Sequence, residues 1–312
     1  MKYPKFLKKN DLVGITALSS GTGDKILEVK VALNHLKEYF HLIITPDVYG
    51  EEIVSADKET RIKEINELLD EDIKLLLNIR GGDFLYETLG GIDYSKIVKK
   101  NLWIMGYSDI TNFLYILTTK YDLATIYGFN AKSFDDLVLN KYQLNNLEIL
   151  QGNIIKQESF DNSTISINGN FKDKGILIGG CLDTLRYLIG TEYDKTNSFI
   201  EKYKDYKIVW YFDIFSMDSV DFYLTVLELN KLGWFKYSDT FLLGRVLFPK
   251  EECNLSYLEA MKRVFNDKNI VFNADIGHVR PSFTLINGSL ANIEYKDDKL
   301  MLKMEFLDEN NG

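Results

Sequence analysis

The chain has 312 residues, 46% of them hydrophobic and 27% charged, and its 37 Lys and Arg against 46 Asp and Glu leave a net charge of −9. These values are typical of a soluble globular protein with room for one large domain or two of ordinary size. The acidic balance argues against nucleic-acid and anionic-membrane partners, and no apolar run approaches the roughly 20 residues that a membrane span needs.

Strand and helix patterns alternate through the first 130 residues. Apolar periodicity predicts helices at 24–40 and 57–70, and a third from Ile110 through Leu117. Continuous apolar runs predict strands at 12–18, 41–45, 73–79, 102–105 and 123–129. Apolar strands that alternate with helices predict a parallel sheet covered on both faces.

The composition changes over residues 131–170, which are rich in Asn and Asp and end in what resemble short polar strands or a linker. We expect a domain boundary within 135–170 and divide the chain into 1–150 and 151–312. Regular patterns then resume, with expected strands at 174–180, 207–212 and 240–246 and helices at 181–189 and 220–233. Residues 291–307 predict a hairpin that turns at Asp297-Asp298.

Cysteine usage and the N-terminal residues bear on the compartment. The two cysteines, Cys181 and Cys253, lie far apart and in no Cys/His grouping, which disfavours a disulfide framework or a structural zinc site. The first ten residues hold four lysines, but no apolar segment of the kind found in signal peptides follows. We therefore expect a cytoplasmic protein.

Ser108 is the first candidate for chemistry. It follows an apolar strand and Gly106 and precedes a helix, which is the strand–turn–helix geometry of a nucleophile elbow. The last glycine of the G-x-S-x-G signature is replaced by Ile110, so the motif is not that of the α/β-hydrolases. The alternative is that Ser108 or Asp109 simply caps the helix.

A serine nucleophile needs a base, and the chain has three histidines. His35 and His41 lie in a predicted helix and at the start of a predicted strand, where structural roles are expected. His278 lies in the segment NADIGHVRPSF, beside Gly277, where a loop is predicted, and loops on a rigid scaffold commonly carry catalytic side chains. His278 is therefore the candidate base.

A catalytic histidine is in turn oriented by a carboxylate. Asp213 ends the apolar strand KIVWYFD and is the first candidate, while Asp218 and Asp275 are competitors that spacing does not exclude. An oxyanion hole needs fixed N–H donors, and the candidates are the amides of Asp109 and of Gly82 in NIRGGD. A Gly-Gly after a strand is also ordinary turn chemistry.

Several ordered motifs together resemble one family. KKNDLVGITALSS is similar to its opening "G-D-x-I-x-I-x-A-P-S-S", NIRGGD to its R-G-G turn, and GYSDIT to its nucleophile motif. GGCLDTLRYLIGTEY is similar to its glycine-led helix that ends in G-T-x-Y, and NADIGHVRPSFTLINGS to its histidine segment. The chain thus resembles the LD-carboxypeptidase family of serine peptidases, which includes muramoyl-tetrapeptide carboxypeptidases and microcin C immunity proteins.

The resemblance implies an α/β fold, with an N-terminal doubly wound parallel-sheet domain and a smaller C-terminal α+β domain, in a homodimer whose site lies between domains. It implies Ser108 as nucleophile, His278 as general base, and the Gly82 and Asp109 amides as oxyanion donors. It implies no metal and no cofactor. In one departure, Asp213 stands where the family has a glutamate, which shortens the side chain by about 1.5 Å.

The resemblance leaves two substrates open: the L,D-bond of a peptidoglycan tetrapeptide, and the amide-type bond of a peptidyl-nucleotide such as microcin C. A bidentate arginine would suit the terminal carboxylate of a peptide, and the candidates are Arg80, Arg186, Arg245 and Arg280. Two alternatives remain. One is a small-peptide binding protein whose turnover is impaired by Asp213, and the other is an amidotransferase-like domain with Cys181 as nucleophile at a helix start.

Overall fold

The computed structural model describes residues 1–154, 156–161 and 163–307. The chain forms two compact units that divide after Ile154. In the described residues, no helix has the length and apolar character needed to cross a membrane.

The N-terminal unit is built on five parallel strands in the order β5-β4-β3-β1-β2. Their bounds are β1 Leu12–Thr16, β2 His41–Ile44, β3 Leu75–Asn78, β4 Trp103–Gly106 and β5 Thr125–Tyr127. β3 and β4 are buried along their whole length, because helices cover both faces of the sheet. The expectation of a doubly wound parallel sheet is confirmed.

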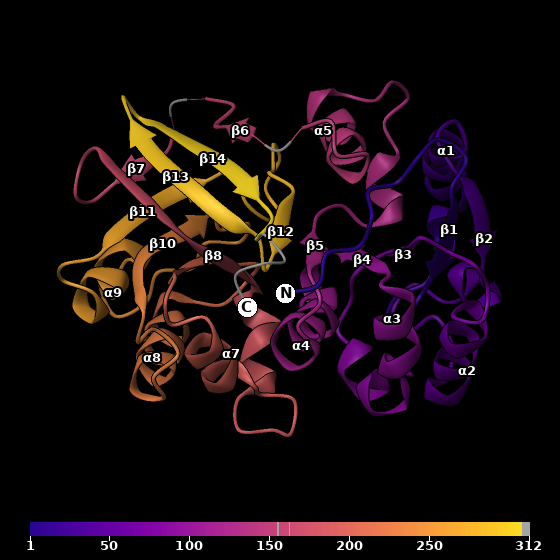
Figure 1. Ribbon diagram of the computed structural model, residues 1–312, viewed down its shortest axis with the longest axis horizontal. Helices are drawn as coiled ribbons and strands as arrows, with labels where there is room; N and C mark the ends of the chain where they lie inside the picture. The colour runs from indigo at the N-terminus through magenta and orange to yellow at the C-terminus, as the bar shows by residue number, and fades with distance from the viewer. Residues whose placement is uncertain (155, 162, 308–312) are drawn as a thin grey trace. The chain divides into compact units, whose positions relative to one another are not determined.

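Helices α1 and α5 lie on one side of this sheet, and α2, α3 and α4 lie on the other (Figure 1). Their bounds are α1 Ile26–Lys37, α2 Lys58–Leu68, α3 Tyr94–Lys100, α4 Thr111–Tyr121 and α5 Lys141–Leu150. Strand-to-helix connections of this kind place the loops after β1, β3 and β4 at one edge of the sheet, where α/β proteins bind ligands.

The C-terminal unit is built on an eight-stranded mixed sheet in the order β6-β14-β13-β8-β9-β10-β11-β7. The four central strands are parallel: β8 Phe171–Cys181, β9 Lys207–Asp213, β10 Ser238–Gly244 and β11 Asn269–Ala274. The antiparallel hairpin is β13 Leu290–Lys296 and β14 Lys299–Glu305, and Asp297 and Asp298 at its turn have φ of 53° and 60°. The hairpin and its turn are as predicted.

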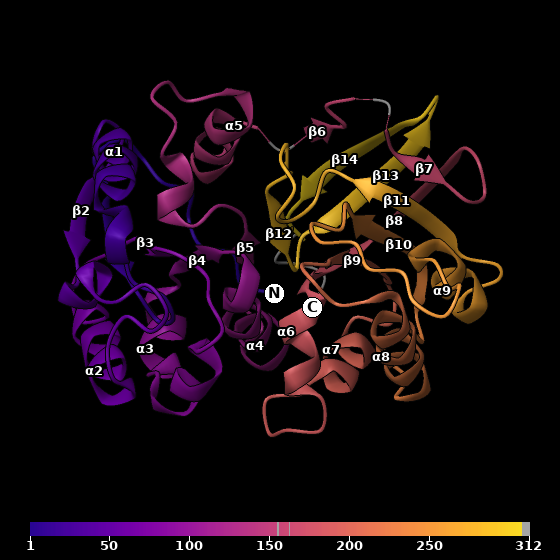
Figure 2. The ribbon, with the colours of Figure 1, turned by 180° about the vertical axis from the view of Figure 1, so that it is seen from behind.

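Short segments complete this unit. Strands β6 Lys156–Glu158 and β7 Ile165–Ser166 form the two edges of the sheet, and β12 Leu285–Asn287 leads into a turn that bonds to β8. The helices are α6 Leu182–Leu185, α7 Thr196–Lys202, α8 Ser219–Lys231 and α9 Tyr257–Val264. α7 and α8 lie along the same side of the sheet (Figure 2).

Two expectations need correction. The interval 131–170 holds a full helix, α5, whose start is fixed by a capping box between Asn140 and Gln143. The helix expected at 181–189 is interrupted: α6 ends at Leu185 and a 3-10 turn, Arg186–Leu188, replaces its second half.

Candidate active site

Ser108 stands at a strained turn between β4 and α4. It opens a 3-10 helix, Ser108–Ile110, and its φ is 68°, in the left-handed region that non-glycine residues rarely occupy. Such strain costs on the order of 1–3 kcal/mol and is concentrated at functional sites. A residue that merely caps a helix has an extended backbone. The geometry therefore favours the nucleophile-elbow hypothesis over the capping alternative.

The R-G-G turn after β3 lies directly against this serine. A Cβ added to Gly81 would stand 2.6 Å from Ser108 Cβ and 2.9 Å from its Oγ. Gly82 has φ 158°, and a Cβ there would overlap the hydroxyl of Ser19. Both glycines are needed, because any side chain would push the turn away from Ser108 or from the loop after β1.

Asp109, which follows Ser108, is buried with 3% of its surface exposed. Its burial raises its pKa to about 6, although hydrogen bonds from Ser19 and from the amides of Leu85 and Gly82 oppose the rise. The Gly82 amide therefore lies near the side chain of Asp109, whose own amide is the second expected oxyanion donor.

Two residues that the sequence analysis did not single out hold these loops. The Asn130 Oδ1 accepts the Tyr107 N–H at 3.2 Å, which fixes the residue before the candidate nucleophile. Arg61 is fully buried in α2 and donates to the carbonyls of Leu18 at 2.7 Å and Phe84 at 3.2 Å. An arginine among the apolar positions of an amphipathic helix is the signal that predicts such a buried brace.

In the C-terminal unit, the structure brings Asp213 and His278 together. Asp213 ends β9 and His278 lies in the loop after β11, so both stand at the carboxyl ends of parallel strands. The Asp213 Oδ2 is 2.7 Å from His278 Nδ1, and the His278 backbone N–H donates to Asp213 Oδ1 at 3.3 Å. The aspartate side chain is fully buried and 9% of the histidine side chain is exposed. The carboxylate thus orients the ring.

The other acids and histidines have different partners. Asp218 caps α8 and accepts two backbone N–H groups, and Asp275 pairs with Arg245 and accepts the Phe160 N–H at 2.8 Å. His35 in α1 lies 2.9 Å from the Asp136 carbonyl. His41 is exposed at the start of β2. Of the three candidate acids, Asp213 is the one that the described part of the chain shows in contact with His278.

A further carboxylate, Asp183, holds the loop that covers the histidine ring. Its oxygens accept the backbone N–H groups of Phe215 (2.9 Å), Ser216 (2.9 Å) and Met217 (2.8 Å). The Phe215 ring lies 4.7 Å from the His278 ring, centroid to centroid. Asp183 was not expected from the sequence, because its partners follow it by more than 30 residues.

Cys181 ends β8 directly opposite Asp213 in the parallel register. It is 1% exposed, and burial together with the negative charges of Asp213 and Asp183 raises the pKa of its thiol well above the usual value. A nucleophilic cysteine needs the opposite change, a lowered pKa. The hypothesis that Cys181 is the nucleophile is therefore not supported.

Among the candidate arginines, Arg245, which follows β10, is bound to the loop after β11 that carries His278. Its guanidinium pairs with the buried Asp275 and donates to the carbonyls of Pro281 at 2.5 Å and Val279 at 3.3 Å. These contacts fix the segment that follows His278.

The other three arginines are more open. Arg80 donates to the Gly21 carbonyl at 3.1 Å and pairs with Glu52 at 3.2 Å. Arg186 lies 3.5 Å from Asp221, and Arg280, two residues after His278, is exposed.

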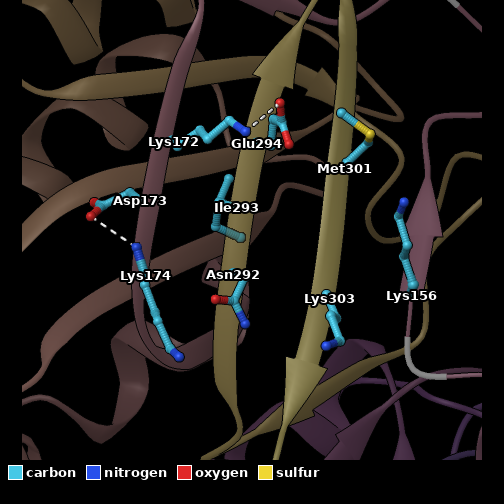
Figure 3. A pocket seen from close by; sticks show the side chains of 9 residues that line it. All are labelled: Lys156, Lys172, Asp173, Lys174, Asn292, Ile293, Glu294, Met301 and Lys303. Atoms are coloured by element: carbon cyan, nitrogen blue, oxygen red, sulfur yellow. Dashed lines mark hydrogen bonds and ion pairs between the residues drawn. The ribbon is translucent and has the colours of Figure 1, made fainter.

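A hollow of about 590 Å³ lies elsewhere in the C-terminal unit, over strands β6, β14, β13 and β8 (Figure 3). Its lysines face carboxylates: Lys172 pairs with Glu294 at 3.0 Å, and Lys303 with Glu305 at 2.6 Å. It holds neither a candidate nucleophile nor a histidine, so the candidate chemistry lies elsewhere. The lining residues are Lys156, Lys172, Asp173, Lys174, Asn292, Ile293, Glu294, Met301 and Lys303.

The two units, each with candidate residues at the carboxyl ends of parallel strands, define an α/β protein, and comparisons give its family. Residues 13–128 match the LD-carboxypeptidase N-terminal domain, and residues 174–293 match the LD-carboxypeptidase C-terminal domain. The chain belongs to the LD-carboxypeptidase family.

Three relatives illustrate the similarity. The chain is 24% identical to the microcin C7 self-immunity protein MccF of Escherichia coli over 81% of this chain and 80% of that protein. It is 25% identical to the putative carboxypeptidase YocD of Bacillus subtilis over 94% and 96% of the two chains. The third relative is the muramoyltetrapeptide carboxypeptidase of Oxalobacter formigenes, a solved structure at 20% identity and TM-score 0.77 over 95% of this chain and all of that one.

A solved structure of MccF holds glutamyl sulfamoyl guanosine. It shares the fold with a TM-score of 0.82 at 18% identity, over 99% of this chain and 100% of that chain. The recognition of the family from the sequence motifs is confirmed, as is the fold class.

Proposed function

We propose that this protein is a serine-type carboxypeptidase that hydrolyses a terminal amide bond through an acyl-enzyme. The Asp213–His278 contact of 2.7 Å supports the proposal most directly, because a carboxylate held against Nδ1 is the arrangement that orients the histidine in such a mechanism. The strained backbone of Ser108 supports it independently.

In the proposed reaction, His278 takes the proton of Ser108 as the hydroxyl attacks the substrate carbonyl. Because Asp213 engages Nδ1, the other ring nitrogen, Nε2, is the atom that accepts this proton. The amides of Gly82 and Asp109 stabilise the oxyanion, His278 then protonates the leaving amine, and water releases the acyl group. The mechanism requires no metal and no cofactor.

The substrate class is a small peptide or a peptidyl-nucleotide. The relatives support both: one is a muramoyltetrapeptide carboxypeptidase, and MccF has been solved with an aminoacyl sulfamoyl nucleoside. Arg80, Arg186 and Arg280 remain the better candidates for a substrate carboxylate, since Arg245 is paired with Asp275 and bonded to the loop that carries His278. We further propose a cytoplasmic homodimer, for which sedimentation of the purified protein is the test.

The test uses both substrates and one covalent probe. Wild-type protein is expected to release D-alanine from a peptidoglycan tetrapeptide or an aminoacyl group from a sulfamoyl nucleoside, and to react with a fluorophosphonate probe. Ser108→Ala is expected to do neither. Absence of labelling in both proteins, or no turnover of either substrate by folded wild type, would contradict the proposal and favour a binding protein.

A further inference from the structure

The side chains of Cys181, Asp213 and His278 bring three different donor atoms close together. The Cys181 sulfur, an oxygen of Asp213 and a ring nitrogen of His278 all lie within 4.8 Å of one another. The proposed reaction uses Asp213 and His278 but gives the thiol no task. The cluster is nearly closed to solvent, with Cys181 at 1% exposure and the Asp213 side chain at 0%.

The donor set is that of a zinc site. Thiolate, imidazole and carboxylate are the three ligand types that Zn²⁺ binds, at about 2.0–2.3 Å each. In a tetrahedral site, such ligands stand about 3.3–3.7 Å from one another. The Asp213–His278 contact of 2.7 Å would have to open slightly and the widest separation, at most 4.8 Å, would have to close by about 1 Å, which small side-chain rotations accomplish.

We propose that Cys181, Asp213 and His278 form an inhibitory binding site for Zn²⁺ or a similar thiophilic divalent cation. Three protein ligands leave a fourth position, which a water that enters with the metal would fill. On binding, the Cys181 thiol releases its proton to solvent as the sulfur–metal bond forms. The Nδ1 atom of His278 gives its lone pair to the metal, and the ring proton moves to Nε2.

This proton shift explains why the site inhibits. With Nδ1 on the metal and the proton on Nε2, neither ring nitrogen of His278 can accept a proton from a serine. The Asp213 carboxylate is also withdrawn from the ring. The inhibition rests on the proposed serine hydrolase function, whereas the binding of the metal does not.

Binding is tested first, without any substrate. Co²⁺ is added to the full-length protein as a spectroscopic substitute for Zn²⁺, and a sulfur-to-cobalt charge-transfer band reports thiolate ligation. The exposed Cys253 supplies the matched control. Wild type and Cys253→Ser are expected to show the band and Cys181→Ser to lack it, with Zn²⁺ displacing the cobalt.

The expected loss of Zn²⁺ affinity in Cys181→Ser is at least the roughly 10–100-fold that removal of an outer-shell partner costs. A band that persists in Cys181→Ser, or one that only Cys253→Ser removes, would overturn the proposal. X-ray absorption of the zinc-loaded Cys253→Ser variant gives a second measurement that does not depend on the folding of Cys181→Ser. One sulfur and one imidazole are expected in the first shell, and a shell of oxygen alone would overturn the site.

The inhibition is tested with the two candidate substrates. Micromolar Zn²⁺ is expected to abolish turnover by wild type and Cys253→Ser and to spare Cys181→Ser, which keeps its basal activity. If the band is present and no protein turns over substrate, the proposed function fails and the metal site stands. If turnover is present and equally zinc-sensitive in all three proteins, the metal site fails and the proposed function stands.

Discussion

The carboxylate of Asp213 contacts His278 twice, through Oδ2 to Nδ1 at 2.7 Å and through Oδ1 to the backbone N–H at 3.3 Å. The backbone approaches this closely because residue 277 is a glycine with φ 91°, and a Cβ there would overlap the Asp213 carboxylate. The glycine thus allows the loop to lie directly against the carboxylate.

We therefore expect Gly277→Ala to lower kcat by between about 10²- and 10⁴-fold, the range between a small misplacement of a catalytic group and the loss of its orienting acid. Gly169→Ala is the matched control, because Gly169 also has a positive φ, 72°, but nothing within 4 Å of an added Cβ. It carries only the backbone strain of about 1 kcal/mol and keeps its kcat. Steady-state kinetics on both variants, with circular dichroism to verify folding, is the measurement. An unchanged kcat in folded Gly277→Ala would show that the close approach is unnecessary.

The strained backbone at Ser108 predicts that glycine is more stable than alanine at this position, although both replacements abolish activity. Ser108→Ala and Ser108→Gly both remove the hydroxyl, and both are expected to lose activity and probe labelling. The glycine variant is expected to be more stable than the alanine variant by about 1 kcal/mol, because glycine tolerates φ 68°.

At an ordinary helical position the order reverses. Lys63 lies in the middle of α2, where Lys63→Ala is expected to exceed Lys63→Gly in stability by about 0.5–1 kcal/mol. Urea unfolding of the four variants measures both differences. If Ser108→Ala were the more stable member of its pair, the backbone of Ser108 would not be strained.

The elements predicted from the sequence are those that carry strong apolar patterns. The buried strands β1, β3, β4 and β9 appear as continuous apolar runs, since both faces are covered. Helix α5 was missed because its sequence, KYQLNNLEIL, is rich in polar residues that suggest a loop, although Asn140 and Gln143 do carry the capping-box signal. Long apolar runs thus located the central strands, whereas the short buried strand β12 was not predicted.

The site divides in the same way. Ser108, Gly82, Asp213 and His278 could be proposed from the sequence because they follow apolar strands or stand in glycine-containing loops. The burial of Arg61 is indicated by its place among the apolar positions of α2, but its carbonyl partners, like the amide partners of Asp183, are distant in the chain and no local pattern contains them. The proximity of Cys181 to His278 likewise arises only from the order of β8, β9, β10 and β11 in the sheet.

The raised pKa of Asp109 predicts a pH-dependent stability. Its pKa is about 6 in the folded protein and 3.8 in the unfolded chain, so between these values the folded state binds more protons. Stability from this group therefore falls as pH rises from about 4 to about 6, by about 3 kcal/mol in total. Asp109→Asn removes this dependence.

Urea unfolding of wild type and Asp109→Asn from pH 4 to pH 7.5 tests this sign. The free energy of unfolding of the variant, relative to wild type, is expected to increase across the interval. Asp57 provides a control of opposite sign, because hydrogen bonds from Thr60 lower its pKa. With the titration of this control extended down to about pH 2.5, Asp57→Asn is expected to lose stability relative to wild type as pH rises to about 4 and to show a constant difference above it. A flat difference for Asp109→Asn would mean that its carboxylate is well solvated.

Asp183 predicts an effect on turnover without direct contact to His278. Its two oxygens accept three backbone N–H groups and, at 3.3 Å, the Ser216 hydroxyl. In Asp183→Asn one oxygen becomes an NH₂ group that faces an N–H donor, so that hydrogen bond is lost and the Phe215 loop is displaced. Because Phe215 packs on the His278 ring, we expect kcat to fall by about tenfold or more, with KM nearly unchanged.

Asp218→Asn is the matched control. Asp218 accepts two backbone N–H groups as an N-cap, a position where asparagine serves as well as aspartate, so kcat is expected to stay at the wild-type value. Equal kcat values for the two variants would mean that the Asp183 hydrogen bonds stabilise the loop without orienting the histidine.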